Sequence, residues 1–277
     1  MKQSNIKTSG EPAISVIIML FLYAFVHFTL NKFLEGWGNP EKAFYFSIII
    51  LSLLTIFLVG VFQKLKEKIP FFYGYSDQLR GSNILTGMFF AITLTCTGTL
   101  ILFLNNNILW KDIILPGNIF IYFILLLLVA IAEETLFRGY ILRNLLKILP
   151  VFPSLLISSF VFGLFHVFNP DVSWIAVLNI IMGGIVMGSM YLKGKSLYMP
   201  IAFHFFWNIM LGPVLGFPVS GVKIASILQT EFRGSILISG GDFGFEASVL
   251  CTVLLLSAAT LILSKVNTEK QIQVVEN

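Results

Sequence analysis

Residues 119–142 of this 277-residue chain read IFIYFILLLLVAIAEETLFRGYIL. The segment is apolar and long enough to cross a bilayer as a helix, since about 20 residues span the hydrocarbon core. Towards its end it carries Glu133, Glu134 and Arg138. A charged side chain at bilayer depth costs roughly 2.5–3.5 kcal/mol on insertion scales, so such residues are first candidates for a functional site. The rest of the chain has to supply partners for them.

The spacing of the three charges separates them into a pair and a single residue. Glu134 and Arg138 are four residues apart, so they share one helix face and can form an ion pair. Glu133 lies about 100° further around the helix and has no such local partner. We therefore interpret Glu134 and Arg138 first as a structural pair, and Glu133 as the carboxylate that meets groups from other helices.

Composition limits the class of protein. The chain is 57% hydrophobic and 12% charged, with a mean hydropathy of +0.89. These values exclude a soluble domain and also a soluble domain with one anchor, and they leave no basis for a nucleic-acid partner. Cys96 and Cys251 lie in apolar runs, where we interpret them as small hydrophobic residues. The lipid bilayer is the expected environment.

Eight apolar runs are long enough to span a membrane, which predicts an all-α fold: a polytopic bundle of eight transmembrane helices. The runs lie near 13–31, 43–62, 84–104, 119–142, 151–168, 173–192, 196–217 and 247–264. An even number of spans puts both termini on one side, and most of the 18 Lys and Arg residues fall on that side. The positive-inside rule then predicts a multi-pass protein of the cell membrane with cytoplasmic N- and C-termini. No internal repeat is present, so we expect a single membrane-embedded domain over residues 1–277.

The two longest connections, 63–83 and 218–246, differ in character. The first contains KLKEK and the aromatic residues 71–73, and either an interfacial segment or a solvated loop fits it. The second is rich in Gly and includes the sequence FGF at 243–245, and we expect it to dip into the membrane.

Two further apolar segments carry polar side chains at helical spacing. Glu134 and His166 are equally far in sequence from Pro150, so a helical hairpin that turns at Pro150 brings them to similar depth. His204 and Asn208 are four residues apart and share one helix face. We therefore expect the segments near 119–142, 151–168 and 196–217 to converge. His27, the third histidine of the chain, is interpreted as structural.

Two chemistries suit Glu133, His166, His204 and Asn208. In the first, Glu133, assisted by His166, deprotonates a water that attacks an amide carbonyl, and His204 and Asn208 donate hydrogen bonds to the oxyanion. In the second, His166, His204 and a glutamate, with Glu133 as the candidate, ligate Zn²⁺ that keeps a position open for water. The helical zinc signature HExxH is absent, so the sequence favours the first scheme, and the expected cofactor is none or Zn²⁺.

The ordered residues resemble the motifs of the CPBP family of intramembrane proteases, which includes the CAAX-processing endopeptidases of prenylated proteins and the bacterial Abi or bacteriocin-immunity proteins. The motif EExxxR matches Glu133, Glu134 and Arg138, FxxxH matches Phe162 and His166, and HxxxN/D matches His204 and Asn208. The segment SGGDFGFEAS also resembles one found in bacterial members. The resemblance covers a motif-bearing core over about 119–246.

This resemblance implies an eight-helix fold with a cavity open to the cytoplasm and an endopeptidase activity. It also implies that Glu133 activates water with His166 beside it, that His204 and Asn208 form the oxyanion site, and that Glu134 and Arg138 belong to the catalytic set. The family is often described as metalloproteases. The expected substrate is a membrane-associated peptide or protein, in a CAAX-type or a peptide-maturation or immunity role. The alternative is a non-catalytic membrane immunity or scaffold protein of the Abi type, whereas the missing repeat disfavours a transporter.

Overall fold

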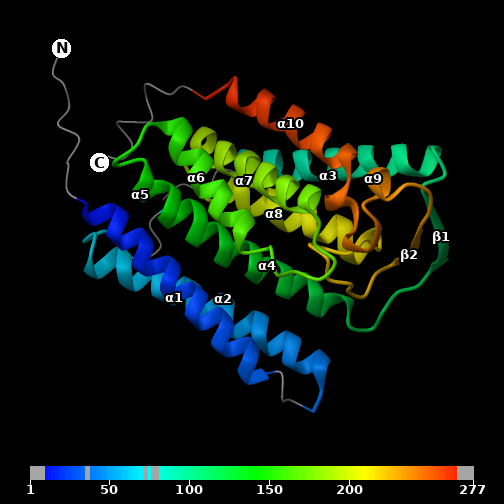
Figure 1. Ribbon diagram of the computed structural model, residues 1–277, viewed down its shortest axis with the longest axis horizontal. Helices are drawn as coiled ribbons and strands as arrows, with labels where there is room; N and C mark the ends of the chain where they lie inside the picture. Colours follow the sequence, from blue (N-terminus) through cyan, green and yellow to red (C-terminus); the bar gives the residue numbers. More distant parts are fainter. Residues whose placement is uncertain (1–9, 35–37, 71–73, 76–80, 267–277) are drawn as a thin grey trace.

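Most of the chain is helical in the computed structural model, which describes residues 10–34, 38–70, 74–75 and 81–266 (Figure 1). The helices are α1 Glu11–Leu34, α2 Pro40–Leu65, α3 Gly81–Leu104, α4 Ile119–Leu136, α5 Arg143–Leu145, α6 Val151–Leu164, α7 Trp174–Gly194, α8 Tyr198–Ile209, α9 Ile236–Ser239 and α10 Val249–Leu263, with π-helices η1 Phe137–Leu142 and η2 Met210–Val214 and 3₁₀-helices η3 Gly241–Phe243 and η4 Phe245–Ala247. Two strands, β1 Ile108–Ile113 and β2 Leu228–Phe232, complete the set.

Each of the eight apolar segments predicted from the sequence is largely helical. Within the described residues, five helices are long and apolar enough to cross a membrane: α1, α2, α3, the continuous helix 119–145, and α7. The helices α6 and α10 are apolar but shorter, and α8 has 12 residues before it continues as η2. The chain is a membrane protein by these criteria, and the number of eight crossings stays a prediction.

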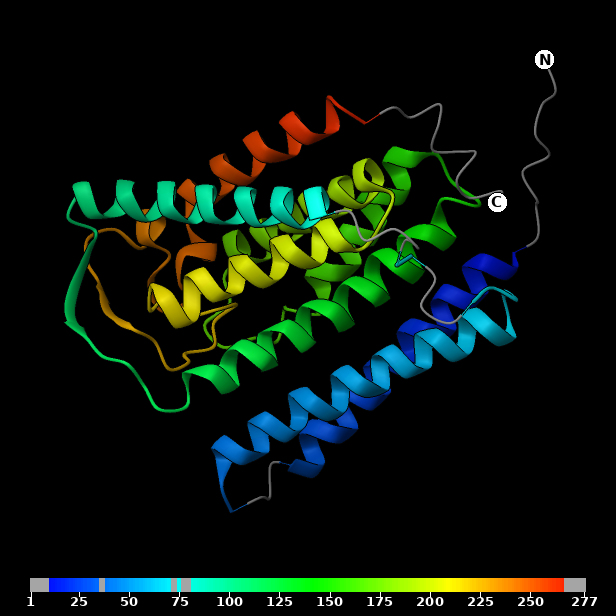
Figure 2. The same ribbon diagram turned by 180° about the vertical axis from the view of Figure 1, so that it is seen from behind.

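The helices form a layered bundle. The hairpin of α1 and α2 lies along α4 on one side, and α3 and α10 flank α7 and α8 on the other (Figures 1 and 2). The Cβ of an alanine at Gly87 in α3 would lie 2.3 Å from the carbonyl oxygen of Met199, so the absence of a side chain there lets α3 pack closely on α8. Helix α8, which carries His204 and Asn208, is therefore held tightly against α3.

Glycines of α7 have a similar role at the interface with α6. A Cβ at Gly184 would lie 2.9 Å from the Cβ of Ser159, and one at Gly188 would lie 2.3 Å from a methyl carbon of Leu155. The missing side chains at these two positions therefore let α7 pack closely on α6. Gly183 differs, since it has no atom within 4 Å of such a Cβ and instead lines a cavity.

A two-stranded antiparallel sheet closes one end of the bundle and was not predicted. Strand β1 follows α3, and β2 belongs to the long connection before α10, with Trp110 opposite Thr230 (Figure 1). Lys111 and Glu231 form an exposed ion pair at 2.7 Å across the strands. The sequence ILWKDI is too short to show a clear alternation, and its partner lies more than a hundred residues away, so pattern alone did not reveal the pairing.

Polar contacts at the other end connect α2 to α5. Glu67 follows α2 and pairs with Arg143 and with the Lys147 ammonium at 3.0 Å, and it accepts a hydrogen bond from the Asn144 amide at 2.9 Å. Burial raises the pKa of the Glu67 carboxyl, but Arg143, Asn144 and Lys147 more than offset this, and the pKa lies below its ordinary value of 4.5. In the same connection, the aromatic residues 71–73 lie outside the described residues.

The Glu67 cluster predicts a loss of stability in acid. A carboxyl with a lowered folded-state pKa stabilises the fold above its unfolded-state pKa, and this contribution disappears as the pH falls through the folded value. We expect the thermal midpoint of the protein in detergent to fall between about pH 5 and pH 3, and to fall less in Glu67→Gln. The check is a thermal unfolding series against pH for both proteins. Equal acid sensitivity of the two would contradict the assignment.

Candidate active site

The α-helix α4 changes to the π-helix η1 two residues after Glu134. The backbone N–H of Phe137 contacts the carbonyl oxygens of both Glu133 and Glu134, and the six residues Phe137–Leu142 form the wider turn. Short π-helical segments occur frequently at functional sites. This change of winding places Arg138 with its side chain 1% exposed, inside the bundle.

The ion pair predicted from the spacing of Glu134 and Arg138 is confirmed. Their Oε1 and Nη1 atoms lie 2.7 Å apart, and both side chains are almost fully buried. Arg138 also donates through Nη2 to the carbonyl oxygen of Gly184 in α7 at 3.0 Å, and its guanidinium carbon lies 4.7 Å from the centre of the Phe162 ring in α6. The hairpin of α4 and α6 is therefore formed as predicted, with Arg138 joining three helices.

His204 of α8 lies between the two glutamates. Its Nδ1 is 3.0 Å from Glu134 Oε1, and because an ionised carboxylate is an acceptor, Nδ1 carries the proton of this bond. Its Nε2 lies 3.9 Å from Glu133 Oε2. The bond between His204 and Glu134 was not predicted from the sequence. In the structure the Glu134 carboxylate interacts with both Arg138 and His204.

His166 lies just beyond the end of α6, since the helix ends at Leu164 and not near 168 as predicted. Its Nδ1 is 2.9 Å from the carbonyl oxygen of Phe162, so Nδ1 carries a proton and the neutral ring has its lone pair on Nε2. The Phe162 ring lies 4.8 Å from the His166 ring and 6.3 Å from the His204 ring, measured between centres. The two imidazoles are therefore held against one aromatic side chain.

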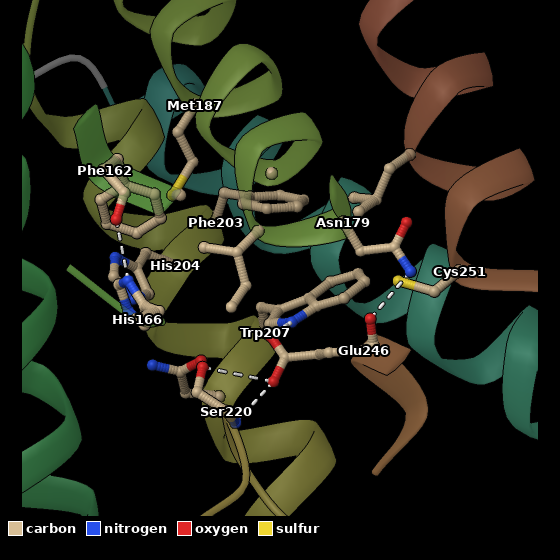
Figure 3. Close-up of a pocket in the computed structure, with 14 residues that line it drawn as sticks. Phe162, His166, Asn179, Met187, Phe203, His204, Trp207, Ser220, Glu246 and Cys251 are labelled. Atoms are coloured by element: carbon tan, nitrogen blue, oxygen red, sulfur yellow. Dashed lines mark hydrogen bonds between the residues drawn. The ribbon is translucent and has the colours of Figure 1, made fainter. Parts of the chain in front are cut away.

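Three of the predicted site residues, His166, His204 and Asn208, line one cavity (Figure 3). Glu133 is not among the residues that line it, but its carboxylate is 19% exposed and faces His204. The complete lining consists of Phe162, His166, Asn179, Ile180, Gly183, Met187, Phe203, His204, Trp207, Asn208, Ser220, Glu246, Cys251 and Leu255. The two histidines and the amide thus lie around one cavity, and Glu133 lies 3.9 Å from His204 Nε2.

Comparison with protein families agrees with the motifs. Residues 115–210 match the family model for type II CAAX prenyl endopeptidase Rce1-like proteins, which is about a third of the chain. We call residues 115–210 the Rce1-like segment because of this similarity. The resemblance to CPBP and CAAX proteases stated from the sequence is thus confirmed. No curated protein and no solved structure matched the chain in the corresponding comparisons.

The Rce1-like segment contains all six predicted site residues, from Glu133 to Asn208. The family is one of proteases, so the match supports a hydrolase in a lipid bilayer that acts on a membrane-associated substrate. The match by itself does not assign roles to the individual side chains.

Part of the cavity lining comes from residues after the Rce1-like segment. No functional role was predicted for these residues from the sequence. Glu246 accepts hydrogen bonds from Trp207 Nε1 at 3.0 Å and from the backbone N–H of Ser220 at 2.6 Å (Figure 3). The neighbouring Phe243 and Phe245 are fully buried, so the FGF sequence packs into the bundle of helices. The available signal was a glutamate directly after FGF and directly before an apolar helix.

Helix α1 lies beside the Rce1-like segment at the edge where Glu133 is exposed. The Tyr23 ring packs edge to face on Phe165 and Phe137, with ring centres 4.9 Å and 6.4 Å apart. Glu133 interacts electrostatically with both Tyr23 and His27. His27 therefore lies near the proposed site, which its position in the sequence did not indicate.

The zinc scheme requires Glu133, His166 and His204 to surround one point. Over the part of the chain that the structure describes, no group of three or more His, Cys, Asp or Glu side chains has a geometry that could hold a metal ion. His204 Nδ1 is bonded to Glu134 and His166 Nδ1 to a backbone carbonyl, so each ring has its Nε2 left for a metal ion, as metal-ligating histidines usually have. The residues present do not form the predicted set of Glu133, His166 and His204 around a metal.

Proposed function

We propose that the protein is an intramembrane endopeptidase that hydrolyses a peptide bond in a membrane-associated protein or peptide. The observation that carries the proposal is the position of His204, bonded to Glu134 through Nδ1 and facing Glu133 through Nε2, on the same cavity as His166 and Asn208. An acid, two imidazoles and an amide at one buried, polar spot have the composition of a hydrolytic site.

In the first step Glu133 acts as the general base. Its distance of 3.9 Å to His204 Nε2 exceeds a direct hydrogen bond, and a water between such groups is the usual bridge. Glu133 takes a proton from this water, and the oxygen forms a bond to the carbonyl carbon of the substrate. The lone pair of His166 Nε2 assists by accepting a hydrogen bond from the same water.

In the second step the charge that develops on the substrate oxygen is stabilised by donors on α8. The Asn208 amide and His204 Nε2, as an imidazolium, donate to this oxyanion. Glu134 balances the imidazolium charge through Nδ1, while Arg138 balances Glu134. Glu134 and Arg138 act as positioning residues in this scheme, since they hold His204 and do not face the substrate.

In the last step the tetrahedral intermediate collapses. The C–N bond breaks, and Glu133 returns its proton to the leaving amine, which regenerates the carboxylate. The products are a peptide with a new carboxyl group and one with a new amino group. The scheme needs no further reactant.

The placement in the membrane is part of the proposal. We infer a single membrane-embedded domain with its motif-bearing core at about 119–246, eight crossings and cytoplasmic termini, in the cell membrane. Support comes from the apolar helices and from the excess of Lys and Arg on one side of the predicted spans. A CAAX-type role and a peptide-maturation or immunity role both remain compatible with this placement.

The test is cleavage of membrane-anchored, fluorescence-quenched peptides by the purified protein in liposomes, with prenylated and non-prenylated series in parallel. Mass spectrometry of the products identifies the bond. Cleavage that requires Glu133 supports the proposal. Absence of cleavage of every peptide, together with a protective effect of the Glu133→Gln variant in cells, would instead favour the non-catalytic immunity or scaffold role.

Chelation separates the two chemistries. If Glu133 is a base that acts on free water, extended dialysis against EDTA should leave the cleavage rate within about twofold of the untreated protein, because no bound metal has to lower the pKa of the water. The measurement is the rate before and after dialysis, with metal content determined on the same samples. Loss of activity that Zn²⁺ restores would overturn the metal-free scheme.

A further inference from the structure

The cavity is lined by an acidic group that the proposed mechanism does not use. Glu246 lines it from the side opposite His166 and His204, is 8% exposed, and lies in the η4 turn before α10 (Figure 3). Its carboxylate oxygens accept from Trp207 Nε1 and from the Ser220 N–H. Both of these groups can only donate, so the arrangement suits an ionised carboxylate.

The charge of Glu246 lacks the compensation that other buried carboxylates of the protein have. Glu134 pairs with Arg138 and His204, and Glu67 pairs with Arg143 and Lys147. Among the described residues, no Lys, Arg or His nitrogen lies within 4.0 Å of the Glu246 carboxylate. A buried charge with neutral donors alone is costly, and a cation that enters the cavity relieves part of that cost.

The Glu246 carboxylate lies near the residues that are proposed to hold the scissile bond. Glu246, His204 and Asn208 line the same cavity, and Glu246 bonds to Trp207, the neighbour of Asn208 in α8. An extended peptide advances roughly 3.3 Å per residue, so we expect a group bound at Glu246 to belong to a residue within about three positions of a bond held at His204 and Asn208.

We propose that Glu246 is a specificity site that binds a positively charged group of the substrate, the ammonium of a Lys side chain or the guanidinium of an Arg side chain, within three residues of the cleaved bond. This inference rests on the proposed endopeptidase function and names the substrate class: a membrane-associated peptide with a basic residue beside the scissile bond. The ionic contact forms inside the cavity, where a carboxylate discriminates strongly between a cation and an apolar side chain of similar length.

The competing explanation is a structural role, in which the hydrogen bonds of Glu246 with Trp207 and Ser220 only hold the connection 218–246 against α8. Glu246→Gln helps to separate the two roles, because its amide oxygen still accepts one of the two hydrogen bonds while the charge is removed. Glu246→Asp is the matched control, since it keeps the charge and shortens the side chain. A purely structural role predicts that the cleavage of all substrates changes equally. A recognition role predicts that the preference for basic over apolar substrate residues changes.

The experiment compares peptides of one sequence, anchored by an acyl chain, with Lys, norleucine or Glu at each position up to three residues from the cleaved bond. For the wild type we expect kcat/KM for Lys to exceed that for norleucine by at least about tenfold at one position, and to exceed that for Glu by more. In Glu246→Gln the ratio of Lys to norleucine should fall to within about twofold, and Glu246→Asp should keep a preference for Lys. Equal cleavage of Lys and norleucine peptides by the wild type would overturn the inference, as would a Glu246→Gln variant that slows both equally.

A binding measurement keeps this test separate from that of the proposed function. The same peptides are titrated onto the Glu133→Gln protein in nanodiscs, with and without Glu246→Gln, and the Kd values are compared. Tighter binding of the Lys peptide that depends on Glu246 supports the cation site even if no peptide is cleaved by the wild type, a result that would count against the endopeptidase alone. Binding without any dependence on Glu246 would refute the cation site whether or not cleavage occurs.

Discussion

Replacing Glu133 with Gln should lower the rate of peptide hydrolysis by about 10²–10⁴-fold, the usual contribution of a general base. Glutamine has nearly the same shape and can still hold a water, but it cannot take the proton. The Glu133 side chain is 19% exposed and lies 3.9 Å from His204 Nε2, so its loss should leave the helices in place. The measurement is kcat/KM on an anchored peptide, with the thermal midpoint determined in the same detergent.

A matched control is Glu231→Gln, which removes a carboxylate from the exposed pair of β2 with Lys111. It should leave the cleavage rate within about twofold of the wild type, because surface ion pairs contribute little. If Glu133→Gln behaves like this control and still turns over its substrate, Glu133 is not the base and the catalytic scheme fails. Loss of both activity and folding in Glu133→Gln would mean that the glutamate is structural.

Replacing Arg138 with Leu should destabilise the fold by roughly 3–5 kcal/mol, as measured for buried ion pairs that lose one partner. Arg138 is 1% exposed, pairs with Glu134 at 2.7 Å and donates to Gly184, and its removal leaves the Glu134 carboxylate with His204 as its remaining charged partner. The free energy of unfolding in mixed micelles is the quantity to compare. We expect activity to fall with it, because His204 then loses a fixed acceptor.

Two further variants distinguish this electrostatic cause from lost packing. Arg138→Lys keeps a positive charge but not the planar group over Phe162, and should be intermediate in stability. The double variant Glu134→Gln with Arg138→Leu removes both charges and should recover much of the loss, since no buried carboxylate is left without its arginine. A single Arg138→Leu protein as stable as the wild type would show that the pair contributes nothing to the fold.

The sequence predicted the helices well because membrane-length apolar runs are a strong signal. It also predicted the pairing of Glu134 with Arg138, which depends on helical spacing within one segment. The contact between His204 and Glu134 was missed because it depends on the rotation of α8 relative to α4, which spacing along one helix does not fix. The π-helical turn at Phe137–Leu142 was missed for a similar reason, since no residue type specifies it.

Glu246 shows a different limit of the sequence analysis. The glutamate stands in a connection whose Gly and Phe residues suggested a loop in the membrane, and its role depends on Trp207 and Ser220, which come from other parts of the chain. The prediction that the α6 helix ends near residue 168 was wrong. The apolar composition continues past Leu164, but the helix ends there. Composition thus located the segments, but the cavity depends on how they are rotated and where they end.

The shared carboxylate of Glu134 has a mechanical consequence. Through Arg138 and His204 it ties α4 to α7 and α8, and the Arg138 guanidinium adds α6 through the Phe162 ring. Separating any of these four helices would expose a charge to hydrocarbon, so they should move as one rigid block during turnover. Helix α1 contacts this block through the edge-to-face packing of Tyr23 on Phe165, so apolar packing of aromatic rings joins α1 to the four helices at this point.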